Sequence, residues 1–105
     1  MTTKNKKSDA VRFLEGITGG AVTFGRLLEA IRLGEEISQV QFARRLAISK
    51  AHLCDIEKGR RSVTPGRAAK FAGLLGYSPE RFVKLCVQDQ LNQAGLKLRV
   101  EIEAA

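Results

Sequence analysis

Apolar residues recur at intervals of three or four along most of this chain. Phe24, Leu27, Leu28 and Ile31 follow Thr23 at that spacing, which places their side chains on one face of a helix. The same spacing returns in four later segments, at residues 38–46, 49–58, 64–75 and 78–95. A shorter apolar pattern at residues 9–17 predicts one more helix near the N-terminus. The chain is therefore expected to be all-α, with one modest core.

Local signals mark where these helices begin and end. Ser38 and Ser49 are good N-cap residues, because a serine hydroxyl can accept a hydrogen bond from an N–H of the first helical turn. Thr64 and Ser78 each precede a proline, and proline suits the first position of a helix. Gly59 fits the turn that ends the helix begun at Ser49.

The last segment has a different pattern. Residues 96–103 alternate apolar and charged side chains, which is typical of a half-buried β-strand. A strand needs a partner strand to be stable, and the rest of the sequence offers none. The apolar side of this expected strand, to which we assign dimerisation, consists of Leu96, Leu98, Val100 and Ile102.

The charges of the same segment match a second copy of it. In an antiparallel pair centred on Val100, Lys97 would lie opposite Glu103, and Arg99 would lie opposite Glu101. A two-fold homodimer is the expected result. The alternative is a strand that adds to the sheet of a different protein.

Composition and charge narrow the class of protein. The 105 residues carry a net charge of +7 and a pI near 9.9, which fits a polyanionic partner and also fits a merely basic surface. Cys54 and Cys86 follow no metal or redox spacing, so they are expected to be free thiols in a reducing cytoplasm. No apolar run approaches a membrane span, and charged residues interrupt any signal-peptide core. We expect a cytoplasmic protein with no cofactor and no metal.

Residues 38–59 carry the most informative pattern, two short helices joined by a tight turn. Phe42 and Leu46 lie on one face of the first helix, and Leu53 and Ile56 lie on one side of the second. The opposite side of the second helix carries small and polar side chains. This arrangement suits a second helix that enters the major groove of DNA.

Residues 31–83 resemble the Cro and phage-repressor-type helix-turn-helix proteins, also called the XRE family. The shared pieces are residues 37–43 (ISQVQFA), 46–49 (LAIS), 56–61 (IEKGRR) and 74–78 (LLGYS), all in order. The resemblance implies a five-helix lambda-repressor-like DNA-binding domain. The expected organisation is an N-terminal arm and short helix at 1–22, the helix-turn-helix domain at 23–95 and a dimerisation strand at 96–105.

The resemblance also implies which residues contact DNA. The base-reading positions hold Lys50, Ala51, His52 and Asp55. Lys50 suits guanine O6 and N7, Ala51 suits a thymine methyl, and Asp55 suits cytosine N4. The phosphate-contacting positions hold Gln39, Arg60, Arg61, Ser62 and Arg67, and contacts of that kind set position and salt sensitivity more than sequence choice.

Three further expectations follow from the resemblance. Arg32 and Glu57 stand where family members form an ion pair that ties two helices together. Glu36 stands where glycine is frequent. Asp55 brings a negative charge to a position where a neutral or basic residue is commoner, which would raise the cost of non-specific binding and sharpen specificity.

The expected function is that of a sequence-specific regulator of transcription that binds double-stranded DNA as a homodimeric repressor and reads a palindromic operator. The alternative is an antitoxin that represses its own operon and binds a toxin through residues 1–22 or the C-terminal strand. An enzyme is not expected, because the single histidine, His52, lies at a DNA-facing position and no nucleophile has a base beside it.

Overall fold

The computed structural model describes residues 22–105, which form five helices. In chain order these are α2 (Phe24–Gly34), α3 (Gln39–Leu46), α4 (Lys50–Glu57), α5 (Pro65–Leu75) and α6 (Pro79–Gln93). The all-α class and the five expected helices of the domain are confirmed. The short helix expected at residues 9–17 lies outside the described residues. No helix within residues 22–105 is long and apolar enough to cross a membrane.

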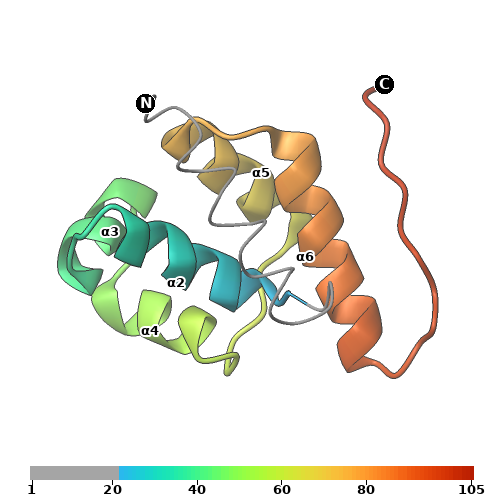
Figure 1. The fold of residues 1–105 in the computed structure, drawn as a ribbon, viewed down its shortest axis with the longest axis horizontal. Coiled ribbons are helices and arrows are strands. Elements are labelled where there is room, and N and C mark those ends of the chain that lie inside the picture. Colours follow the sequence, from blue (N-terminus) through green and yellow to red (C-terminus); the bar gives the residue numbers. More distant parts are fainter. Residues whose placement is uncertain (1–21) are drawn as a thin grey trace.

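The five helices enclose a single core. α5 packs on α6, α3 contacts both α4 and α5, and α2 contacts both α4 and α6, as Figure 1 shows. The largest fully buried side chains come from all five helices and are Leu28, Phe42, Leu46, Leu53, Ile56, Phe71, Phe82 and Cys86. Burial of one such leucine or phenylalanine side chain contributes about 1.5–3 kcal/mol. The helical spacing of the sequence therefore identified the inward faces correctly.

The start of α2 is fixed to α6 by packing and by one backbone hydrogen bond. The ring of Phe24 meets the ring of Phe82 edge to face, with centroids 5.7 Å apart. The Phe24 N–H donates to Oδ2 of Asp89 at 3.1 Å, so a carboxylate satisfies one N–H of the first helical turn. Residues 65 positions apart in the sequence thus hold the first described helix against the last one.

Side-chain caps begin most of the helices. The residues that accept a backbone N–H as N-caps are Thr23, Ser38, Ser49 and Thr64. At Ser38 the cap is a full capping box, because the Gln41 side chain accepts from the Ser38 N–H at 3.0 Å. Ser78 is the exception, since its hydroxyl donates to Glu80 Oε1 at 3.0 Å and makes no cap bond.

Two turns place residues other than glycine in the left-handed region. Glu36 has φ 58°, and Ala47, in the turn between α3 and α4, has φ 60°. A side chain with a Cβ adopts this region at a cost of about 1–2 kcal/mol. The glycine that the resemblance leads one to expect before Ile37 would adopt this conformation freely, whereas Glu36 adopts it at that cost.

Gly25 is required by a close crossing of helices. A Cβ atom at Gly25 would lie 2.1 Å from the backbone carbonyl oxygen of Ile56, far inside van der Waals contact. The absence of a side chain lets α2 approach the C-terminal end of α4. This crossing sets how α4 is oriented on the rest of the domain.

The C-terminal strand was not a correct prediction for the chain by itself. Residues 96–105 are non-helical, and no residue within 22–105 belongs to a strand. The segment runs back along α6 in the direction opposite to the helix (Figure 1). Its two closest anchoring contacts are with the side chain of Gln88. The alternating pattern shows which side chains prefer burial and which prefer solvent. A β-strand also needs the backbone of a second strand to hydrogen-bond with.

Candidate nucleic-acid interface

α3 and α4 form the two-helix unit that the sequence predicted at residues 38–59. The inward side of α4 holds Leu53 and Ile56, which are 0% and 2% exposed. On its other side, Lys50 and Ala51 are exposed, while His52, Cys54 and Asp55 are half-buried. The described part of the chain thus leaves the predicted base-reading side of α4 open to solvent at its N-terminal end.

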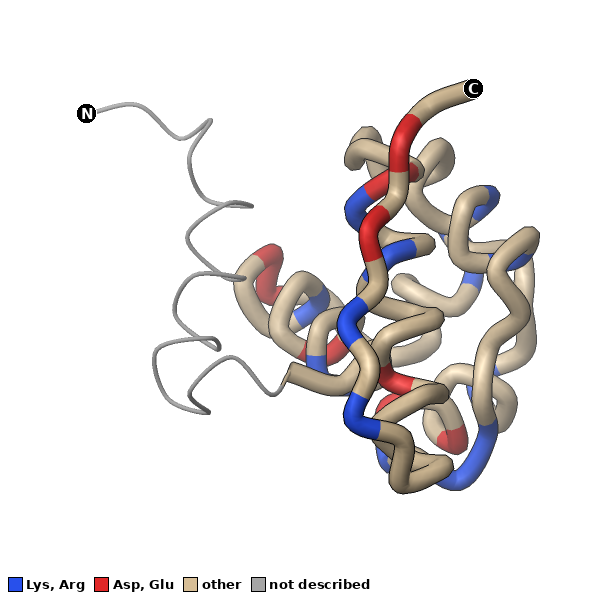
Figure 2. Tube along the Cα trace, turned by 90° about the vertical axis from the view of Figure 1, so that its right-hand side faces the viewer, with Lys and Arg blue, Asp and Glu red and all other residues tan. Residues whose placement is uncertain are grey.

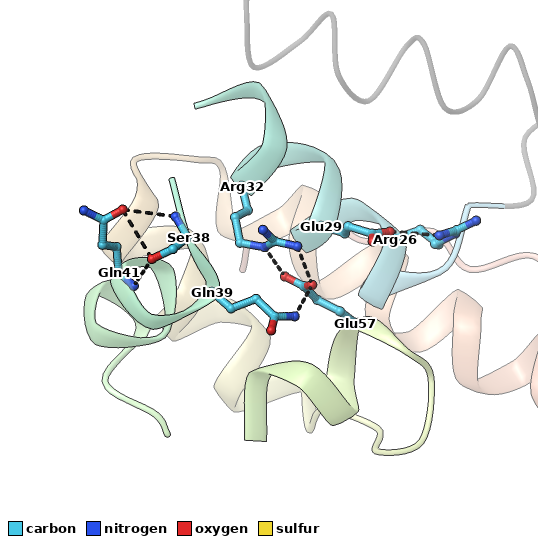
Figure 3. Close-up of polar contacts among 7 residues, drawn as sticks. All are labelled: Arg26, Glu29, Arg32, Ser38, Gln39, Gln41 and Glu57. Atoms are coloured by element: carbon cyan, nitrogen blue, oxygen red, sulfur yellow. Dashed lines mark hydrogen bonds and ion pairs between the residues drawn. The ribbon is translucent and has the colours of Figure 1, made fainter. Parts of the chain in front are cut away.

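A buried carboxylate holds α4 to the two helices before it. Glu57, at the end of α4, accepts from Arg32 of α2 through two hydrogen bonds, Nε to Oε2 at 2.9 Å and Nη2 to Oε1 at 3.0 Å. It also accepts from Nε2 of Gln39, the first residue of α3, at 3.0 Å. Figure 3 shows the three side chains converging from their three helices. The expected ion pair of Arg32 and Glu57 is confirmed.

The contact between Arg32 and Glu57 is shielded from solvent. The side chain of Glu57 is 3% exposed and that of Arg32 is 13% exposed. Hydrogen bonding to the carboxylate raises the pKa of Arg32 above its ordinary value, against the opposing effect of burial. Bidentate pairing of this kind fixes relative orientation as well as contributing energy. α4 is therefore presented at a defined angle.

The turn after α4 brings Arg60 back over the helix. Gly59 has φ 77°, the Gly59 N–H donates to the Ile56 carbonyl at 3.1 Å, and the Arg60 N–H donates to the Asp55 carbonyl at 2.8 Å. These two bonds form a Schellman motif. As a result the Arg60 guanidinium meets the Asp55 carboxylate, with Nη2 3.0 Å and Nε 3.1 Å from Oδ1.

A second contact joins a predicted base-reading residue to a predicted phosphate-binding residue. Nη1 of Arg67, in the first turn of α5, lies 3.5 Å from Nδ1 of His52. Partial burial, together with the positive charges of Arg61 and Arg67, lowers the pKa of His52 below 6.5. His52 is therefore neutral at pH 7, and its Nδ1 can accept from the guanidinium.

The structure brings most of the predicted site residues together on α4 and the segment that follows it. Arg61 and Ser62 are exposed in the connection between α4 and α5. They also line a groove of about 510 Å³ bounded by the start of α2, the end of α4 and α6. Gln39 is half-buried beside Glu57, so its amide belongs to the support of α4 whether or not it also reaches a phosphate.

The site list drawn from the sequence omitted two contributors. Cys54 lies on the outward side of α4 with its Sγ 3.9 Å from Nη2 of Arg60. Gly59 was expected only to end the helix, yet its turn is what places Arg60 against Asp55. A glycine four residues after an aspartate and directly before an arginine was the available signal.

Comparison with known proteins agrees with this geometry. A family model described as a helix-turn-helix domain matches residues 23–85, more than half of the chain. The chain belongs to the helix-turn-helix family. No curated protein and no solved structure matches the chain. The family assignment supports a DNA-binding regulator, and the narrower resemblance to Cro and phage-repressor proteins stays a prediction.

Proposed function

We propose that this helix-turn-helix protein is a sequence-specific regulator of transcription that reads double-stranded DNA with the outward side of α4. One observation carries the proposal. The helix has an apolar side packed in the core, an ionic anchor at Glu57 and an opposite side that is open at Lys50 and Ala51. A rigid helix with an accessible N-terminal half fits a major groove.

The side chains on that surface divide into two groups by the contact they are suited to make. Lys50 and Ala51 project from the first turn of α4, where a recognition helix meets base edges. His52 follows them in the same turn, Asp55 lies one turn further along, and both add groups that can hydrogen-bond to bases. Arg61 and Ser62 are exposed beside the end of α4 and suit contact with phosphates, which fixes position on the duplex.

Gln39 and Arg67 are further members of the phosphate-contacting group, at the starts of α3 and α5. The Gln39 amide nitrogen gives one hydrogen to Glu57 and carries a second that can be donated to a phosphate. Arg67 is exposed at the start of α5, where its guanidinium can turn between His52 and the DNA backbone.

We further propose that the protein acts as a homodimer and represses transcription by occupying a palindromic operator. A two-fold dimer would present two copies of α4 about 34 Å apart, one turn of B-DNA, so each would read one half-site. The chain's net charge of +7 favours association with DNA over a neutral chain of the same fold. The self-matching charges of residues 97–103 support the dimer.

Selection of bound sequences from random duplex DNA tests this function, with the full chain and several salt concentrations. The proposal predicts a palindromic consensus that persists as salt increases, because base contacts depend less on counterion release than phosphate contacts do. Binding that falls steeply with salt and enriches no consensus would reject sequence-specific reading. A consensus without two-fold symmetry would reject the dimeric part alone.

A further inference from the structure

The side chain of Gln88 makes two hydrogen bonds to the backbone of the C-terminal segment, in the pattern that a neighbouring strand would make. Its Nε2 donates to the carbonyl oxygen of Leu98 at 2.8 Å, and its Oε1 accepts from the N–H of Val100 at 2.9 Å. A residue in a parallel β-ladder makes the same two bonds, to the carbonyl and the N–H that flank one residue of its neighbour. The amide of Gln88 therefore stands in for a strand on the α6 side of the tail, defined here as residues 96–103.

This contact decides which edge of the tail is occupied. In an extended chain, the backbone groups of successive residues point to opposite edges. Since those of Leu98 and Val100 point toward α6, those of Arg99 and Glu101 point away from it. The tail lies at the margin of the molecule with α6 on one side (Figure 1). Among residues 22–105, no hydrogen bond reaches the edge made by the odd-numbered residues of the tail, and we call this the open edge.

We propose that a second copy of this chain occupies this open edge, antiparallel to the first and with the two-fold axis at Val100. The inference rests on the proposed homodimer and specifies its interface. The open edge limits the registers that are possible, and the charges select one of them. Both copies must use the backbone groups of their odd-numbered residues, because those groups point to the open edge. A two-fold axis that passes through a residue pairs odd-numbered residues with odd-numbered residues and so meets this requirement.

The charges then choose among the registers that the edge allows. An axis at residue 99 sets Arg99 against its own copy, and an axis at residue 101 sets Glu101 against its own copy. An axis at Val100 instead sets Arg99 against Glu101 twice. Like charges directly across a pair are unfavourable and opposite charges favourable. Figure 2 shows the two basic positions of the tail followed by the two acidic ones, as this arrangement needs.

The apolar side of the tail gains a partner in the same register. Leu98 is 58% exposed, among the most exposed large apolar side chains of residues 22–105. Pairing sets it across from Ile102 of the second copy, and Val100 across from Val100. Gln88 is a positioning residue, because it holds the tail extended before the second copy binds and so lowers the entropic cost of association.

Disulfide trapping tests the register without DNA. The symmetric pair at Val100 is of the non-hydrogen-bonded type, with Cα atoms about 4.5 Å apart, a separation that a disulfide accommodates. In a Cys54→Ser background, Val100→Cys should form a covalent dimer under mild oxidation. The matched variant Leu98→Cys should not, because its two copies lie four residues apart along the pair. Equal trapping of both variants, or of neither, overturns the register.

Charge exchange tests the same interface by sedimentation. Arg99→Glu creates two like-charge pairs in the dimer and should weaken association about tenfold or more. Adding Glu101→Arg should restore association to within about threefold, because the exchanged pair is again complementary. Lys84, 3.9 Å from Glu101, is exposed and contributes little. A double variant as weak as the single one contradicts the pairing.

The variant Gln88→Ala tests whether Gln88 acts by positioning the tail or by stabilising the fold. It should weaken association severalfold and leave the thermal unfolding midpoint of the monomer unchanged, since the tail adds little to the core. Unchanged association would reject the role of Gln88. These measurements contain no DNA, so a chain that dimerises as described but selects no operator would retain this inference and reject the proposed function.

Discussion

Asp55 and Arg60 form an ion pair on the surface proposed to face DNA, with Nη2 of Arg60 3.0 Å from Oδ1 of Asp55. The side chains are 40% and 59% exposed respectively, so the pair is reachable from solvent. It joins a residue assigned to bases with one assigned to phosphates. The negative charge of Asp55 is therefore balanced within the free protein.

Removing the Asp55 carboxylate should increase non-specific binding. In Asp55→Ala, Arg60 is released toward the phosphates, so affinity for an unrelated duplex should rise several-fold at low salt. The plot of log affinity against log salt should steepen by about 0.9, the value for one additional phosphate contact. Fluorescence anisotropy with labelled duplexes over a salt series measures both. Glu80→Ala, at the start of α6, removes the same charge away from α4 and is the matched control. An unchanged slope in Asp55→Ala would show that Arg60 does not turn to phosphate.

The pKa of His52 reports the geometry around α4 without DNA. Because Arg67 contributes to lowering that pKa, Arg67→Ala should raise it toward 6.5, as followed by NMR titration of the imidazole. Because the pKa of His52 is lower in the folded chain, the unfolded chain binds a proton at His52 at a higher pH than the folded chain does. The contribution of His52 to stability is therefore complete above pH 6.5 and declines as the pH falls toward the pKa in the folded protein. An unchanged titration in Arg67→Ala would place Arg67 away from the imidazole.

Loss of the Glu57 carboxylate should be among the most damaging single changes. Glu57→Ala leaves the guanidinium of Arg32 largely buried and unpaired, which costs about 3–5 kcal/mol. Gln39→Ala removes one hydrogen bond to the same carboxylate and should cost about 1.5–3 kcal/mol at most. Urea unfolding of both variants measures the difference. Equal losses would mean that the ion pair does not anchor α4.

The turn between α3 and α4 offers a stabilising change. Ala47→Gly relieves the cost of φ 60°, offset in part by the greater freedom of glycine in the unfolded chain, for a net gain of about 0.5–1 kcal/mol. Gly25→Ala should instead destabilise strongly, because its Cβ would meet the Ile56 carbonyl. Thermal unfolding of the two variants should move in opposite directions. A loss of stability in Ala47→Gly would contradict the assigned turn.

The sequence predicted those features that depend on neighbours along the chain. The inward faces of the helices and the caps at Ser38 and Ser49 follow from spacing and residue type alone. The resemblance supplied the pairing of Arg32 with Glu57, which lie 25 residues apart. What spacing could not supply was the path of the chain after a helix ends.

Two contacts illustrate that limit. Arg60 reaches Asp55 because Gly59 turns the backbone, and the guanidinium of Arg60 then donates to the Asp55 carboxylate. The C-terminal tail was expected as a strand from its alternation, yet in the chain alone it meets the side chain of Gln88. Alternation indicates two faces of different polarity, but a hydrogen-bonding partner is a property of the assembly.

The central claim is that the outward side of α4 reads base pairs, and parallel selection of bound sequences by Lys50→Ala and Arg61→Ala tests it most directly. Lys50→Ala should keep the overall consensus and lose the preference at one base pair in each half-site, a discrimination worth about 1–3 kcal/mol. Arg61→Ala should retain the consensus at every position and bind all sequences more weakly. If the Lys50→Ala consensus matched that of the unaltered protein at every position, α4 would not be reading DNA through Lys50.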